Sequence, residues 1–246
     1  MKKIIYSALA FAMIACNSPK VNDEVEMVGT LNISVTRSES VEDPAAEGRT
    51  TITTPAVEEL AVEVTGNSET YSWATLGDFN ADVARGFTFK AAPYTLFLSY
   101  GEKGVEGYNK PYFEGSTQVE IQGYGLTTTA NVEVALANSI VAIATTSNFD
   151  GYFQQETPKF SVNGIEWNSA SKDMLFLNPG TTTIKCDVVK PSGNKQTITL
   201  DVELKAQTRH TVVFDLPNAG SAEITVKFDS EILNYNEEEF EMNDNA

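Results

Sequence analysis

The chain has 246 residues, enough for two domains of about 100 residues each. It carries 34 acidic and 17 basic residues, and this net charge of -17 disfavours nucleic acid as a partner. A single histidine, His210, and two cysteines, Cys16 and Cys186, are too few for a zinc finger or a disulfide scaffold.

Residues 1–15 are predicted to be an export leader. A basic start, Met1 to Lys3, precedes a mostly apolar, uncharged run from Ile4 to Ala15. This run is shorter than the roughly 20 residues that a membrane-spanning helix needs, and it fits the apolar region of a secretion signal.

The end of the leader, Met13-Ile14-Ala15-Cys16, resembles the lipobox of bacterial lipoproteins, with Met13 where leucine is usual. The resemblance implies cleavage before Cys16 and acylation of Cys16, which would anchor the protein in the outer membrane. The alternative is an ordinary signal in which Cys16 is incidental.

Residues 16–28 form a polar tether without periodicity. Ser18 and the acidic residues that follow resemble the surface-export tethers of Bacteroidetes lipoproteins, which implies exposure at the cell surface, although the periplasmic face remains open. Because the leader removes bases and no acids, we expect the acidic body to stand off the membrane.

From residue 29 onward the pattern predicts an all-β fold. Apolar and polar residues alternate with period two, which marks strands with one buried face. The clearest cases are residues 31–35, 60–64, 132–136, 184–188, 198–204, 212–216 and 224–228. We expect a polar linker from Ser38 to Pro55 and a short helix from Leu76 to Arg85.

Asp78, Asn80 and Asp82 have the spacing of the first calcium ligands of an EF-hand. Val83 and Phe89 then stand where that motif needs Gly and Glu, so the start of a helix is the better interpretation. We expect no metal and no cofactor.

The most distinctive stretch runs from Tyr108 to Gly115 and combines aromatic rings with polar groups. Aromatic faces stack on sugars, and the candidate ligand contacts are Trp73, Tyr108, Asn109 and Tyr112, with Trp167 as a further platform. Alternatively, Tyr112 and Phe113 close one end of a sandwich. We expect Tyr112 to be buried and Tyr108 to be exposed at the loop tip.

The remaining candidate groups are predicted to be structural. Cys186 shares strand parity with Ile184 and Val188, so it should point into the core, whereas His210 should lie on the surface at the start of a strand. The acidic residues 231–246 should form a disordered tail.

The chain contains an internal repeat. Residues 118–121 and 132–143 parallel residues 201–204 and 212–226, and upstream segments agree in order over about 75 residues. We therefore predict two tandem antiparallel β-sandwich domains, Ig-like or transthyretin-like, over residues 29–146 and 147–230.

Several segments together resemble an uncharacterised domain family of Bacteroidetes surface lipoproteins that is fimbrillin-like in style. They are Gly29 to Val35, Leu60 to Val64, Asn109 to Ser116 and Val134 to Val141. The resemblance implies a surface or pilus-associated role and supplies no catalytic residue. In fimbrillin-like pilins a protease cuts after an arginine, which makes Arg49 a candidate protease site. The alternative is an ordinary exposed loop.

The sequence favours a non-catalytic, lipid-anchored surface protein that serves adhesion or pilus assembly. A glycan-binding surface lipoprotein is the alternative, and the partner would be a glycan or a protein. A hydrolase with paired carboxylates is disfavoured because no two acids can be placed facing each other across a cleft.

Overall fold

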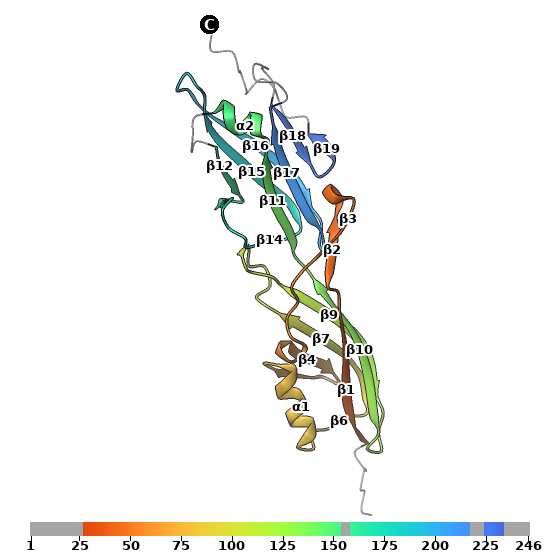
Figure 1. The fold of residues 1–246 in the computed structure, drawn as a ribbon. Coiled ribbons are helices and arrows are strands. Elements are labelled where there is room, and N and C mark those ends of the chain that lie inside the picture. Colours follow the sequence, from red (N-terminus) through yellow and green to blue (C-terminus); the bar gives the residue numbers. More distant parts are fainter. Residues whose placement is uncertain (1–26, 154–157, 217–223, 234–246) are drawn as a thin grey trace, which may run out of the picture.

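The computed structural model describes residues 27–153, 158–216 and 224–233. Most regular structure in these residues is β, which fits the predicted all-β class. The molecule is elongated, with the start of the described chain at one end and the C-terminal half at the other (Figure 1). The predicted leader and Cys16 lie outside the described residues.

The N-terminal half is built on one curled sheet, with an apolar cluster on its inner face. Leu96, Leu98 and Val134 are almost completely buried in that cluster. The strand order is β5 (Glu69–Trp73), β4 (Ala61–Gly66), β7 (Ala92–Tyr100), β9 (Phe113–Ile121), β10 (Thr127–Leu136), β1 (Val28–Arg37) and β6 (Phe89–Lys90).

The predicted short helix is present as α1 (Leu76–Ala84), which packs beside β4 and β5. Thr75 caps it, because the Thr75 Oγ1 atom accepts the N–H of Asp78 at 3.0 Å. The helix follows a 3-10 turn, η2 (Val57–Glu59), in the same region.

The C-terminal half has two sheets. One has the order β13 (Ile165–Glu166), β12 (Lys159–Val162), β15 (Gly180–Val189) and β16 (Lys195–Leu204). The other has the order β19 (Glu231–Leu233), β18 (Thr225–Phe228), β17 (Arg209–Asp215), β11 (Ser139–Thr145), β14 (Leu175–Leu177) and β8 (Gly107–Tyr108).

The two C-terminal sheets share a second apolar cluster. The rings of Phe160 in β12 and Phe214 in β17 lie 5.0 Å apart, and Phe149 of α2 (Ser147–Tyr152) contacts both. Cys186 is completely buried in this cluster, which confirms its predicted inward orientation.

The two halves share a strand order. The run β5-β4-β7-β9 corresponds to β13-β12-β15-β16, and each half also has a first strand parallel to a later one. These parallel pairs are β1 with β10 and β11 with β17. The sheets are therefore not wholly antiparallel as predicted. Each parallel pair is joined by a long stretch of chain, which supplies the crossover connection that parallel strands need.

The meeting point of the halves differs from the predicted boundary near residue 146. Strand β11 pairs with β14 and β17 of the C-terminal half, although the sequence placed residues 139–145 in the first domain. Ile140 packs in the N-terminal cluster and Val141 in the C-terminal cluster, so the two cores meet at adjacent residues of one strand.

The predicted polar linker from Ser38 to Pro55 is largely structured. It forms a hairpin of β2 (Ser40–Asp43) and β3 (Gly48–Thr51) around a 3-10 turn, η1 (Pro44–Ala46). Val41 and Ile52 are buried and anchor the hairpin. Two apolar side chains in a polar segment are too few to produce a visible strand periodicity.

Part of the predicted disordered tail is ordered, because Glu231–Leu233 pairs with β18 as strand β19. Residues 234–246 lie outside the described residues. No helix in the part of the chain that the structure describes has the length and apolar character needed to cross a membrane.

Candidate ligand-binding site

The aromatic stretch singled out in the sequence lies where the two halves meet. Strand β8 leaves the N-terminal half and pairs with β14, placing Tyr108 opposite Leu175. The chain then turns at Asn109, whose φ of 55° is left-handed and whose N–H donates to the Met174 carbonyl at 3.1 Å. It returns through Pro111 to β9, so this loop joins both halves.

Tyr108 is half-buried, not exposed at a loop tip as predicted. Its ring packs 6.3 Å from that of Trp167, and its hydroxyl oxygen accepts the N–H of Asn168 at 2.8 Å. Tyr108 and Trp167, which the sequence suggested as platforms for a sugar, are thus brought together, but each ring covers part of the face of the other.

Tyr112 is buried, with only 6% of its surface exposed. Its hydroxyl donates to Glu114 at 3.0 Å, and Lys103 donates to the same carboxylate at 3.1 Å. Burial, followed by the Glu114 carboxylate, raises the pKa of Tyr112 to about 12. Its N–H donates to the side-chain oxygen of Asn138. This geometry fits the capping interpretation of Tyr112.

A cavity of about 710 Å³ lies on the Tyr112 side of the loop and is named here the Tyr112 cavity. Residues of both halves line it, among them Lys103, Tyr112, Glu114, Asn138, Asn178 and Gln207. The lining also includes apolar residues such as Phe97, Leu136 and Pro179, so the cavity combines an apolar wall with groups that can form hydrogen bonds to a ligand.

A second cavity, of about 890 Å³, lies beside Asn109 and is named the Tyr100 cavity. Its apolar wall includes Tyr100, Pro55 and Phe176, and its polar lining includes Asn109, Lys110 and Lys172. An aromatic ring beside polar groups is the combination that sugar binding requires. The segments that build it, near residues 52–59, 100–113 and 172–176, are far apart in the sequence.

Trp73 is not part of this region. Its ring packs edge-on against Phe79 and Phe87, at 5.0 and 5.4 Å, and its Nε1–H donates to Asp82 at 2.8 Å. This hydrogen bond, followed by one from Arg85, lowers the pKa of Asp82. Trp73 therefore fixes α1 against the sheet, at a distance in the fold from Tyr108.

Arg49, the candidate protease site, lies in β3 and is exposed. Its guanidinium donates to the Ser40 hydroxyl at 2.8 Å and to the Ser40 carbonyl at 2.6 Å. The side chain is thus held against its own hairpin, which opposes its capture by a protease.

The hairpin is fastened to the C-terminal half by an ion pair between the buried Asp43 and the half-buried Arg209, which the sequence did not reveal. Arg209 donates to Asp43 at 3.0 Å, and Thr50 donates to the same carboxylate. Burial raises the pKa of Asp43, but the hydrogen bonds from Thr50 and Arg209 outweigh burial and hold it below its usual value.

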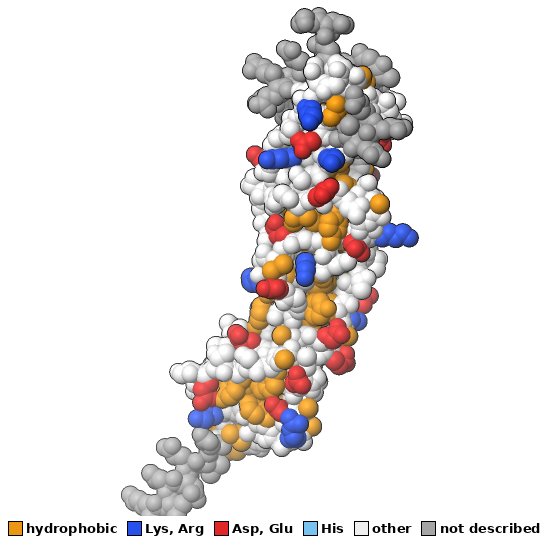
Figure 2. Space-filling view, turned by 90° about the vertical axis from the view of Figure 1, so that its left-hand side faces the viewer, with side chains coloured by type: hydrophobic (Ala, Val, Ile, Leu, Met, Phe, Trp, Pro, Cys, Tyr) orange, Lys and Arg blue, Asp and Glu red, His pale blue; other side chains and the backbone are white. Residues whose placement is uncertain are grey.

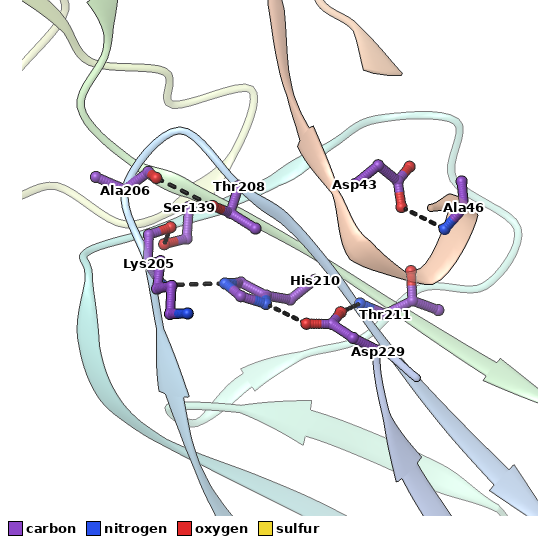
Figure 3. A network of polar contacts seen from close by, with 9 residues as sticks. All are labelled: Asp43, Ala46, Ser139, Lys205, Ala206, Thr208, His210, Thr211 and Asp229. Carbon is purple, nitrogen blue, oxygen red and sulfur yellow. Dashed lines mark hydrogen bonds and ion pairs between the residues drawn. The ribbon is translucent and has the colours of Figure 1, made fainter. Parts of the chain in front are cut away.

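His210 is 2% exposed, so the predicted surface position was wrong. Its Nδ1 atom lies 2.8 Å from Asp229, and its Nε2 atom accepts the N–H of Lys205 at 3.0 Å (Figure 3). Asp229 also accepts the N–H of Thr211. With both ring nitrogens engaged, His210 links β17 to two neighbouring turns and has no nitrogen available for proton transfer to a ligand. His210 lies on the same face of β17 as the buried Val212 and Phe214, and this alternation in the sequence could have indicated that it is buried.

Comparison with solved structures finds distant likenesses. A candidate polysaccharide-binding protein of Bacteroides thetaiotaomicron is 9% identical, with a TM-score of 0.43, covering 84% of this chain and 99% of its own. A candidate cell adhesion protein of Bacteroides eggerthii is 10% identical, with a TM-score of 0.44, covering 82% and 94%. A fimbrial protein of Bacteroides ovatus is 10% identical, with a TM-score of 0.37, covering 77% and 49%.

No curated protein matches the sequence. One family model does match, over residues 27–244, which is nearly everything after the predicted leader and tether. Its description is "Domain of unknown function (DUF4493)", and the chain belongs to this family.

Proposed function

We propose that this protein is a non-catalytic lipoprotein of the outer membrane, anchored through Cys16 and exposed at the cell surface, where it serves adhesion or surface assembly. The observation that carries the proposal is the position at which the chain enters the fold. Strand β1 begins at one end of the elongated molecule, and the C-terminal half lies at the other (Figure 1). A tether that enters at one end presents the opposite end outward.

Contacts between the halves support this proposal, because a presenting rod must resist bending. The hairpin is fastened by the Asp43–Arg209 ion pair, and the Glu42 N–H donates to the Gln207 carbonyl at 2.9 Å. On the other side of the junction, β8 and β14 pair directly. These contacts engage different sides of the junction and oppose hinge motion between the halves.

The anchor is tested by fractionation of cells that produce Cys16→Ala. We expect the variant to be released or left with an uncut leader, while the wild-type protein stays with the outer membrane through a carbonate wash. Cys186→Ala is the matched control, because Cys186 is the only other cysteine and is buried. Retention of Cys16→Ala in the washed membranes would overturn the anchor.

A glycan-binding role is the second candidate, favoured by the Tyr100 cavity with its half-buried aromatic ring and polar lining. A glycan array probed with residues 17–246 tests it. Lys110→Ala should weaken binding because Lys110 lines the cavity, whereas Lys195→Ala, at an exposed position in β16, should not. Equal binding by both variants would exclude this cavity as the site.

A further inference from the structure

Exposed large hydrophobic side chains gather at one place on the molecule. In the described residues the set comprises Met27, Tyr124, Leu126 and Ile232, which are 47%, 82%, 51% and 63% exposed. Three of these, Met27, Tyr124 and Leu126, belong to the end where the described chain begins, and they are named here the tip. Hydrophobic side chains reach that lower end of the molecule in Figure 2, beside the grey trace.

The backbone holds Met27 beside Tyr124 and Leu126, although about a hundred residues of sequence separate Met27 from the other two. The Gly125 N–H donates to the Val28 carbonyl at 2.8 Å, and the Thr30 N–H donates to the Leu126 carbonyl at 2.9 Å. A side chain at Gly123 would collide with Met27 at 2.7 Å, so the turn and the start of β1 are in direct contact.

Tyr124 is displayed by a tight turn. The Leu126 N–H bonds to the Gly123 carbonyl, and Tyr124 and Gly125 have left-handed φ values of 60° and 70°. This is the pattern of a type I′ hairpin turn, whose first central position usually carries Asn, Asp or Gly. A bulky aromatic residue there is unfavourable for the backbone and gains nothing from packing, because its ring is almost fully exposed.

The tip is also free of charge. Residues 27–36 and 121–132 contain no acidic or basic side chain, in a chain of which 21% is charged. Lys90, opposite Val28 in β6, supplies a cation beside these segments. The acidity of the molecule as a whole, which predicts repulsion from a membrane, is therefore not shared by these two segments, although Glu26 directly precedes Met27.

The tip begins a short distance in sequence after the proposed anchor at Cys16. From Cys16 to Met27 the chain spans at most about 40 Å when fully extended, so an acylated Cys16 keeps the tip close to the bilayer surface. Such tethering raises the local concentration of the tip at the surface, so that even a weak apolar contact is occupied. Tyrosine is favoured at this depth, because its ring is apolar and its hydroxyl can remain in the hydrated headgroup layer.

We propose that Met27, Tyr124 and Leu126 form a membrane-contacting tip that rests in the headgroup region of the same bilayer that holds the acyl chains. The proposal depends on the lipid anchor proposed above. The tip and the tether then hold the rod at two points, which orients its C-terminal half away from the membrane. This arrangement differs from the expectation, drawn from net charge, that the whole body stands off the membrane.

The test uses the lipidated protein in phosphatidylcholine vesicles that contain spin-labelled lipid. Tyr124→Cys is labelled with an environment-sensitive fluorophore, and Ile232→Cys, the exposed hydrophobic position outside the tip, is the matched control. Labelling is specific because Cys186 is completely buried, which also raises its pKa, and Cys16 is acylated. Flotation of the protein with the vesicles measures whether the lipid anchor is present, and quenching measures separately whether the labelled position contacts the bilayer.

We expect the protein to float and the label at position 124 to be quenched at least threefold more than the label at position 232. Floating protein with equal quenching at both positions would overturn the tip and leave the anchor intact. Protein that does not float would overturn the anchor and the tip with it. The acyl-free Cys16→Ala chain is also measured without vesicles. A fluorescence shift that grows with protein concentration there would show that the tip binds a second copy of the chain, and would overturn membrane contact.

A second variant guards against insertion driven by the fluorophore. With the label at Met27→Cys, Leu126→Glu should reduce quenching at least twofold, because a carboxylate at the tip resists transfer into the interface. Unchanged quenching would show that the side chains of the tip do not determine the contact, and would overturn the proposal.

Discussion

Tyr112 illustrates, at the scale of a single residue, how packing and ligand binding can be separated. Its ring is buried and its hydroxyl is bonded to Glu114, so Tyr112→Ala should lower the free energy of unfolding by about 3 kcal/mol. Tyr112→Phe, which removes only the hydrogen bond, should cost about 1 kcal/mol.

Urea denaturation measures both Tyr112 variants, with Tyr124→Ala as the control, because Tyr124 is 82% exposed. The control should leave the midpoint unchanged. A Tyr112→Ala protein as stable as the wild type would contradict the capping role and revive the interpretation of Tyr112 as a ligand platform.

Asp43 predicts a specific pH dependence. Because its pKa is lowered in the folded state, it contributes stability that is fully present above its unfolded pKa of about 3.9 and is lost as the pH falls through the folded pKa. Asp43→Asn should therefore be less stable than the wild type at pH 7, with a difference that shrinks below about pH 4.

Chemical denaturation at pH 7 and at about pH 3 provides the comparison for Asp43. Glu42→Gln is the control, since it removes the same charge from the exposed neighbouring position of β2. A stability difference for Asp43→Asn that stays constant over this range would mean that the ion pair with Arg209 contributes nothing through its charge.

Some residues were predictable from the sequence and others were not. The parity of Cys186 placed it in the core correctly, and the same parity at His210, shared with Val212 and Phe214, was overlooked in favour of its position at a strand start. The partners of Asp43 could not be predicted, because Arg209 lies 166 residues away in the sequence. No local pattern encodes a contact of that range.

At the scale of elements, the strands were easier to predict than their partners. The alternation of β15 and β16 identifies both, and the short turn between them makes their antiparallel pairing predictable. The parallel neighbours of β1 and β11 are set by long-range packing, which periodicity does not encode. The Tyr112 and Tyr100 cavities could not be predicted from periodicity either, since each is built from segments that meet only in the folded chain.

Strand β11 determines which fragment folds. It lies between β14 and β17 and contributes Val141 and Ile143 to the C-terminal cluster. Residues 138–246 should therefore give a cooperative β-type melt by circular dichroism, and residues 148–230, which lack β11, should be unfolded. A cooperative melt of the shorter fragment would show that β11 is dispensable to the C-terminal core.

Cleavage after Arg49 should leave β1 in place. The strand pairs with β10 from Thr30 to Arg37, and Leu31 is buried, while Val41 and Asp43 fasten the hairpin upstream of the cut. We expect the nicked halves to co-elute in gel filtration and a labelled peptide of residues 27–37 not to exchange over days.

The Arg49→Gln variant, which removes the cut, is the control for this experiment. Incorporation of the labelled peptide into nicked wild-type protein alone would favour strand exchange between subunits. That result would make pilus assembly the leading function in place of static surface display.

At the scale of the whole molecule, the described chain is an elongated rod of two halves that contact each other (Figure 1). Strand β1 begins at one end of it (Figure 1), and the Tyr112 and Tyr100 cavities lie where the two halves meet. The Asp43–Arg209 ion pair and the pairing of β8 with β14 hold the halves to each other. If Cys16 is acylated, these features together present the C-terminal half away from the membrane.

The most direct measurement is intact-mass and amino-terminal mass spectrometry of the protein extracted from cell membranes. The account predicts a mature chain that starts at Cys16 and carries acyl chains on that residue. A mature chain that starts elsewhere, or an unmodified Cys16, would contradict the claim that the protein is anchored in the membrane through Cys16.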